Sequence, residues 1–187
     1  MKKLIPVFLL LVLASCQTKV SDNETTEKNE PPVNYNPEAK LEQLGITLRP
    51  IGKPVANYDH AVRTGNLLFL AGKGPKQANG ENVVGKVGSD LTVEEGYNAA
   101  REAGINQLSV LKEELGNLSK VKRIVKVKGM VNAVPEFTDH SKVINGYSDL
   151  MVEVFGENGK HARAAVGMGS LPGNMAVEVE MVVEIQD

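Results

Sequence analysis

The sequence contains no tryptophan and a single cysteine, and its aromatic residues make up only 4% of the chain. A lone cysteine excludes an intrachain disulfide, and the core has to be built from Val, Leu, Ile and Ala rather than aromatic rings. The histidines His60, His140 and His161 are scattered and none stands at metal-ligand spacing from another, so we expect no metal site. With a formal net charge of −2, the chain also lacks the basic surplus that is typical of nucleic-acid-binding proteins.

A hydrophobic run long enough to span a bilayer is missing as well, because the apolar stretch at residues 4–13 is too short. It follows a basic pair and ends in Leu13-Ala14-Ser15-Cys16, which resembles a bacterial lipobox. We therefore expect residues 1–15 to be a lipoprotein signal peptide and Cys16 to be the lipidation site, with an ordinary secretory signal as the alternative. The lipobox predicts a lipid-anchored protein of the bacterial cell envelope. Gln17 after the cysteine favours the periplasmic face of the outer membrane if the host is Gram-negative.

Two further regions follow the signal. Residues 16–50 are expected to hold the lipidated cysteine, a flexible polar tether and one short helix, in which Leu41 and Leu44 share a face. Residues 51–187 are long enough for one domain with its own core.

The pattern within this domain predicts an α+β fold. Residues 55–63 and 67–72 are expected to be two strands joined by a turn. A helix should begin at the capping box formed by Thr92 and Glu95 and end at Gly116. A strand over 121–131 follows, then a second helix capped by Asp139 or Ser141 and ending near Gly156, and finally two strands that we expect to pair as a hairpin. This order predicts a mixed sheet with two helices packed on one face.

Two charge patterns admit alternative interpretations. Lys122, Lys126 and Lys128 alternate with apolar residues, which favours the solvated face of a half-buried strand over contact with phosphate or RNA. In the closing strands, Arg163 is expected to oppose Glu178 or Glu180, and spacing alone favours a structural ion pair.

From about residue 55 to residue 185, the chain resembles the RidA/YjgF reactive-intermediate deaminase family, also described as endoribonuclease L-PSP. No single motif is specific, but their combination in this order is. The motifs are Asn57-Tyr58, Ala71-Gly72-Lys73-Gly74-Pro75, Asn145-Gly146-Tyr147, Ala162-Arg163 with Val166, Leu171-Pro172, and Val177-Glu178-Val179-Glu180.

The resemblance implies a chorismate-mutase-like fold, a homotrimer with clefts between subunits, and cofactor-free hydrolysis of 2-imino or enamino acids to 2-oxo acids and ammonia. Arg163 would hold the carboxylate of this small substrate, and Glu178 would position or activate the attacking water; Glu180 is the alternative. Four further positions would bind substrate: Tyr58 from a neighbouring subunit, the Gly72 backbone, Lys73 as an added cation, and Asn145 near the mouth of the cleft.

The chain departs from the usual deaminase pattern at His161, at Ala164-Ala165 and at Lys73. These departures leave open a second interpretation, a non-catalytic module that binds a small carboxylate or a partner at the cell envelope. Ribonuclease activity is a third interpretation, suggested by the family's older description. The net negative charge and the scattered histidines argue against it and against a nucleic-acid partner.

Overall fold

The computed structural model describes residues 36–186, so the predicted signal peptide, Cys16 and most of the predicted tether lie outside the described residues. The chain folds into a mixed five-stranded sheet in the order β1-β2-β5-β3-β4. Its elements are α1 (Pro37–Gln43), β1 (Ala61–Thr64), β2 (Leu67–Lys73), α2 (Val93–Leu115), the 3-10 turn η1 (Leu118–Lys120), β3 (Val121–Asn132), α3 (His140–Phe155), the 3-10 turns η2 (Gly156–Gly159) and η3 (Pro172–Asn174) around β4 (Ala162–Met168), and β5 (Val177–Ile185).

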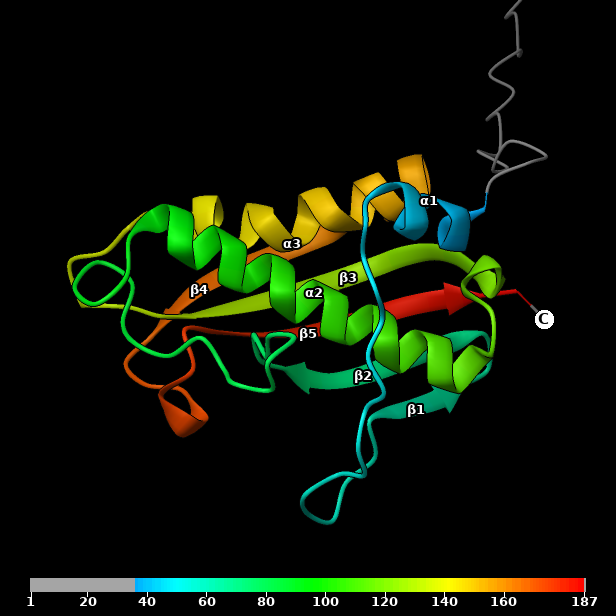
Figure 1. Ribbon diagram of the computed structural model, residues 1–187, viewed down its shortest axis with the longest axis horizontal. Helices are drawn as coiled ribbons and strands as arrows, with labels where there is room; N and C mark the ends of the chain where they lie inside the picture. Colours follow the sequence, from blue (N-terminus) through cyan, green and yellow to red (C-terminus); the bar gives the residue numbers. More distant parts are fainter. Residues whose placement is uncertain (1–35, 187) are drawn as a thin grey trace, which may run out of the picture.

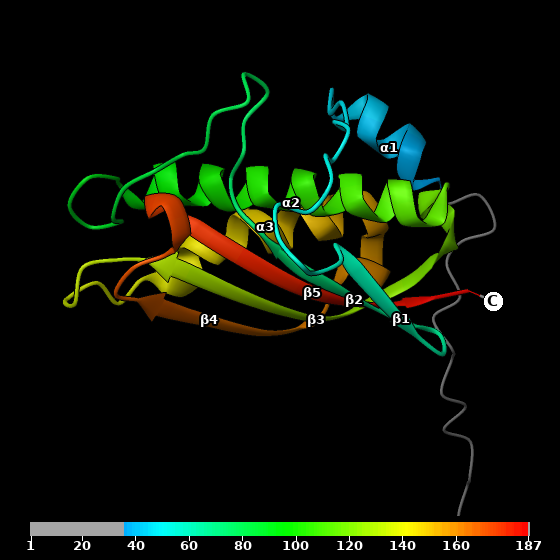
Figure 2. The same ribbon diagram turned by 90° about the horizontal axis from the view of Figure 1, so that it is seen from below.

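The helices α2 and α3 lie side by side on one face of the sheet and leave the other face uncovered (Figures 1 and 2). The alternation in β5 explains this arrangement, because Val177, Val179 and Met181 point into the core while the glutamates between them do not. The predicted α+β fold, with two helices on one face of a mixed sheet, is confirmed.

Local signals place both helices. Thr92 caps α2 through the Glu95 backbone N–H, the Glu95 carboxylate returns to Thr92, and Gly116 ends the helix in the left-handed region. Asp139 occupies the N-cap position of α3, although its side chain makes no capping hydrogen bond, and Gly156 follows the last turn as predicted.

The predicted closing hairpin is wrong. The strands β4 and β5 do not pair with each other; β3 lies between them, parallel to β4 and antiparallel to β5. A parallel pair needs a crossover, and α3 supplies it as the link between β3 and β4. This topology makes β4 an edge strand and β5 the central strand of the sheet.

The folded body begins before the predicted boundary at residue 51. Leu41 of α1 is buried in the core, and an ion pair joins Glu38 to Lys112 of α2. The connection from α1 then crosses over the outer side of α2 (Figure 1), where Arg49 bonds Glu102 at 2.8 Å. Residues 55–60, predicted as the start of a strand, instead form a loop, and β1 is correspondingly short.

Candidate functional site

Arg163 lies on the edge strand β4 and reaches the neighbouring helix α3. Its Nη1 donates to the Asn145 side-chain oxygen at 2.9 Å and to Ser148 Oγ at 3.0 Å. Because Asn145 and Ser148 stand three positions apart on a helix, they present their side chains to the same neighbour. Within residues 36–186, no carboxylate lies within 4.0 Å of this guanidinium, so the predicted cross-strand ion pair with Glu178 or Glu180 does not form.

His161 extends this network. Its Nδ1 lies 2.7 Å from the Gly159 carbonyl oxygen, which can only accept, so Nδ1 carries the ring proton and Nε2 accepts from Ser148 Oγ at 3.0 Å. Burial lowers the pKa of His161 below its ordinary value, and the Arg163 charge lowers it further. The neutral ring is therefore the form that orients the Ser148 hydroxyl, which in turn accepts from Arg163.

Glu178 lies on β5 and turns its carboxylate over the β2 backbone at Gly72. A Cβ atom added at Gly72 would overlap the Glu178 carboxylate oxygen, so the absence of a side chain there makes room for it. Burial raises the pKa of Glu178, and the nearby Glu180 charge adds to this effect. Glu180 differs, since it is exposed and forms an ion pair with Lys128 at 3.7 Å.

Within one chain, Arg163 and Glu178 do not share a site. Arg163 reaches α3 on the covered face of the sheet, whereas Glu178 alternates with the core residues of β5 and so points to the uncovered face. The strands also offset them, because Arg163 pairs with Val127 of β3 and Glu178 pairs with Met130.

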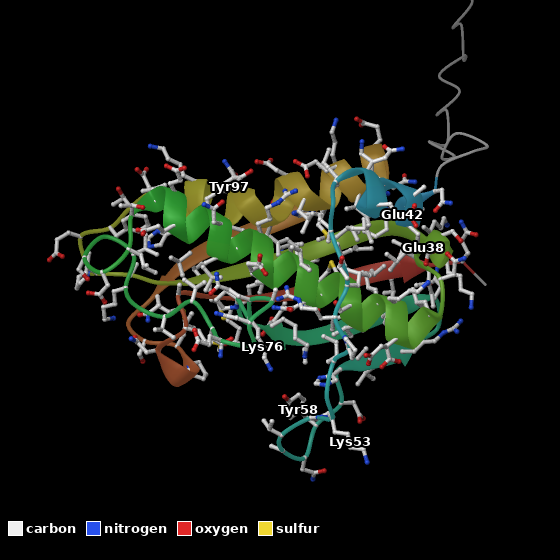
Figure 3. The ribbon with its side chains drawn as sticks, in the orientation of Figure 1. Glu38, Glu42, Lys53, Tyr58, Lys76 and Tyr97 are labelled. Carbon is white, nitrogen blue, oxygen red and sulfur yellow. The ribbon has the colours of Figure 1, made fainter. Side chains whose placement is uncertain are left out.

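Three predicted binding residues come together elsewhere. Tyr58, Gly72 and Lys73 line one cavity of about 600 Å³, between the loop before β1 and the segment that follows β2. Tyr58 stands on this loop, below the sheet in the view of Figure 3, and Lys76 lies in the segment after β2. A single chain therefore brings Tyr58, Gly72 and Lys73 together without a neighbouring subunit, and Asn145 stays with Arg163 outside this cavity.

Lys73 is held inside the cavity by a histidine. Its Nζ lies 2.9 Å from His60 Nδ1, and His60 Nε2 lies 2.8 Å from the Gly52 carbonyl oxygen. Burial lowers the pKa of the Lys73 ammonium, an effect that the negative charge of Glu178 partly offsets.

Two side-chain amides of α2 fix the backbone around Gly72 and Lys73. The fully buried Gln107 donates from Nε2 to the Ala71 and Val179 carbonyl oxygens at 3.1 and 2.8 Å, beside the irregular register between β2 and β5. Asn106 donates to the carbonyl oxygens of Gly74 and Lys76 at 2.9 and 3.0 Å. These bonds satisfy backbone carbonyl groups beside the register shift and in the segment that follows β2.

The sequence did not indicate three of these contributors. His60 and Ser148 bond predicted residues, and Gln107 holds the bulge, but each connection spans distant parts of the chain.

Across the described range 36–186, no group of three His, Cys, Asp or Glu side chains is arranged to hold a metal ion. None of the helices in that range is long and apolar enough to cross a membrane.

Comparison with known proteins assigns this architecture to a family. The model of the family described as "YjgF/chorismate_mutase-like, putative endoribonuclease" matches residues 38–185. The chain belongs to this family. The match begins at the second residue of α1, in agreement with the packing of that helix on the body.

Individual relatives of the YjgF family agree with the assignment. The chain is 44% identical to protein TCP17 of Trypanosoma cruzi over 150 residues, which cover 80% of this chain and 94% of the relative. A 2-iminobutanoate/2-iminopropanoate deaminase of Dermatophagoides farinae is 29% identical, with 72% of this chain and 90% of the relative covered. A crystal structure from Shewanella oneidensis MR-1, described as a "putative endoribonuclease", superposes with a TM-score of 0.77 at 33% identity, covering 80% of this chain and 99% of that one.

Proposed function

We propose that the protein hydrolyses small 2-imino or enamino acids to 2-oxo acids and ammonia. The observation that supports this most is the state of Arg163, whose guanidinium is oriented by Asn145 and Ser148 but neutralised by no carboxylate within the described residues. A guanidinium held in this way suits a planar carboxylate, which it binds through two parallel hydrogen bonds. The Dermatophagoides farinae relative, whose name states this substrate class, supports the same proposal.

Glu178 is the group that we propose to accept a proton from the attacking water. The carbon–nitrogen double bond of an imine is already electrophilic, so catalysis needs chiefly a placed water molecule and a nearby base. The raised pKa of Glu178 makes its carboxylate a better proton acceptor than an ordinary glutamate, whereas Glu180 is engaged with Lys128. Glu178 is therefore preferred over Glu180 for this role.

The opposite orientations of Arg163 and Glu178 favour a site completed by a second subunit. One chain cannot bring both groups to one small substrate, because the sheet separates them. In a cyclic homotrimer, which the family resemblance implies, each interface joins two different surfaces, so Arg163 of one subunit and Glu178 of the next would form one site.

Replacement of Arg163 tests the proposed function. With iminopropionate or iminobutanoate generated by an amino-acid oxidase, Arg163→Ala should lower kcat/KM for ammonia release by roughly 100-fold or more, since truncating one partner of a hydrogen-bonded charge pair costs about 2–5 kcal/mol. Arg163→Lys should retain part of the activity, because a lysine supplies charge without the bidentate geometry.

The matched control is Lys126→Ala, which removes an exposed cation close to Arg163. Lys126 lies on β3 opposite Ala162, the residue before Arg163. It should leave the rate unchanged. If Arg163→Ala and wild type release ammonia equally fast, the deaminase proposal is incorrect.

A second candidate, a non-catalytic module that binds small carboxylates, is favoured by the separation of Arg163 from Glu178 within the chain. Titration calorimetry would select it if 2-oxobutanoate binds wild type, fails to bind Arg163→Ala, and no imine is hydrolysed.

For ribonuclease activity the structure offers little support, because Lys122 and Lys128 are paired with Glu184 and Glu180 on the sheet.

A further inference from the structure

Lys73 differs from the other lysines of its cavity. Lys53 and Lys76 line the same cavity but are exposed, whereas Lys73 is half-buried and bonded to a histidine. Among residues 36–186, no carboxylate lies within 4.0 Å of Lys73 Nζ, so no ion pair compensates the desolvation of an ammonium there. Desolvation therefore makes Lys73 easier to deprotonate than the exposed Lys53 and Lys76, although the Glu178 charge partly opposes this effect.

The histidine contact supplies a proton acceptor at the same nitrogen. Since the Gly52 carbonyl oxygen can only accept, His60 Nε2 carries the ring proton and the lone pair of Nδ1 faces Lys73 Nζ. A neutral imidazole accepts a hydrogen bond without neutralising a positive charge. His60 can therefore take a proton from Lys73 and return it, as a general base and acid does.

The surroundings of the amine suit a small electrophile. Gly72 leaves the backbone beside Lys73 without a side chain, and the Tyr58 ring lies edge-on to His60 with ring centroids 6.0 Å apart. Desolvated lysines with lowered pKa values are nucleophiles toward carbonyl carbon. The backbone around Gly72 and the loop before β1 already form the cavity. A small molecule with an electrophilic C2 atom would meet the Lys73 amine there.

We propose that Lys73 is a reacting amine that forms a Schiff base with C2 of a 2-oxo or 2-imino carboxylate, with His60 as its proton acceptor. The ligand class rests on the proposed function, whereas the covalent site rests on the geometry of Lys73 and His60.

The step balances without a further reactant. The neutral Nζ adds to C2 of a protonated imine, and the π electrons move to the imine nitrogen. One proton passes from Nζ through His60 to that nitrogen, which leaves as ammonia while a double bond forms between C2 and Nζ. Water then adds to C2 of the protonated Schiff base, and breaking of the C2–Nζ bond releases the 2-oxo acid and returns Lys73 as an ammonium. A 2-oxo acid forms the same Schiff base by the reverse of this hydrolysis: the neutral Nζ adds to C2 and water leaves.

Borohydride trapping tests this proposal directly. The purified protein is incubated with 2-oxobutanoate and sodium cyanoborohydride, and the adduct is located by intact mass and peptide mapping. We expect one reduced adduct per chain at Lys73, in wild type and in the matched control Lys76→Arg. Lys73→Arg and Lys73→Gln should each lose the adduct, with unfolding midpoints in urea that show both variants to be folded.

The outcomes separate this proposal from the deaminase proposal. An adduct at Lys73 without ammonia release from imines supports the covalent site and contradicts the deaminase. Fast ammonia release that is unchanged in Lys73→Gln, with no adduct, overturns the covalent site alone. Equal labelling of Lys53, Lys73 and Lys76 also overturns it, because ordinary surface amines would then explain the reaction.

Discussion

Gly72 and Glu178 occupy one small volume where β2 passes beside β5, and the absence of a side chain on the first residue determines where the second can lie. The same glycine also borders the cavity that contains Lys73. A single residue thus connects the proposed general base on the sheet with the proposed amine in the cavity.

Substitution of Gly72 tests this connection. In Gly72→Ala, the new methyl group would overlap the end of the flexible Glu178 side chain, which can swing away at small cost. We expect nearly wild-type stability but a loss of activity of up to about 100-fold, because small misplacements of a catalytic group are costly. Urea unfolding and the rate of ammonia release measure the two effects separately.

The matched control for this substitution is Gly169→Ala. A Cβ atom at Gly169 would meet no atom within 4 Å, so both stability and activity should remain unchanged. Full activity in Gly72→Ala would show that the position of Glu178 over Gly72 is unimportant for the reaction.

At the scale of elements, α2 has a task beyond covering the sheet. Its side-chain amides at Asn106 and Gln107 hold the backbone from Ala71 to Lys76, where the register of β2 against β5 shifts. The helix therefore positions Gly72 and Lys73 through four hydrogen bonds to carbonyl oxygens.

Gln107→Leu should weaken both the fold and the site. The substitution leaves the Ala71 and Val179 carbonyl oxygens without this donor, and an unsatisfied buried polar group costs about 1–3 kcal/mol. We expect a lower urea midpoint and faster amide hydrogen exchange around Gly72. Asn98→Ala, on the exposed side of the same helix, should change neither quantity, and equal effects of the two variants would contradict this role of Gln107.

The elements also show what sequence reasoning can and cannot predict. The ends of α2 were predicted correctly because Thr92, Glu95 and Gly116 act on backbone groups within a few residues. The family motifs likewise selected Tyr58, Gly72 and Lys73, which the structure brings to one cavity. Whether the selected residues perform the proposed chemistry stays a prediction.

The hairpin was predicted wrongly because pairing is a long-range property. The strands β4 and β5 follow each other in sequence and have alternating patterns, which is what a hairpin requires, yet β3 can pair on both of its sides. The contacts of Lys73 with His60 and of Arg163 with Ser148 were missed for a related reason, since each joins two elements whose relative position the sequence pattern does not specify.

At the scale of the whole molecule, the uncovered sheet face carries apolar side chains that a single chain leaves in solvent. Phe69 and Val62 are 44% and 57% exposed, and Val166 of the edge strand is 39% exposed. Such residues are typical of a surface that another subunit covers. They support an assembly in which Glu178 of one chain approaches Arg163 of another.

Mixed assemblies test the shared site. Arg163→Ala and Glu178→Gln should each be inactive alone, but purified hybrid trimers should recover about a third of the wild-type activity, because each hybrid has one heterologous interface that takes both intact residues from different chains. Co-expression followed by purification through two different tags provides the mixture. No recovery in a mixture whose mass shows hybrid assemblies would indicate that both residues act from the same chain.

The central position of β5 also determines when the molecule can be completed during synthesis. The strands β1 and β2 form one pair and β3 and β4 form another, and β5 joins the two pairs by entering between β2 and β3. The ribosome synthesises β5 after β1, β2, β3 and β4. The two strand pairs therefore cannot join into one sheet until β5 has been made. Glu178 is on that strand, and a nascent chain consequently acquires its proposed general base in the same event that closes its sheet.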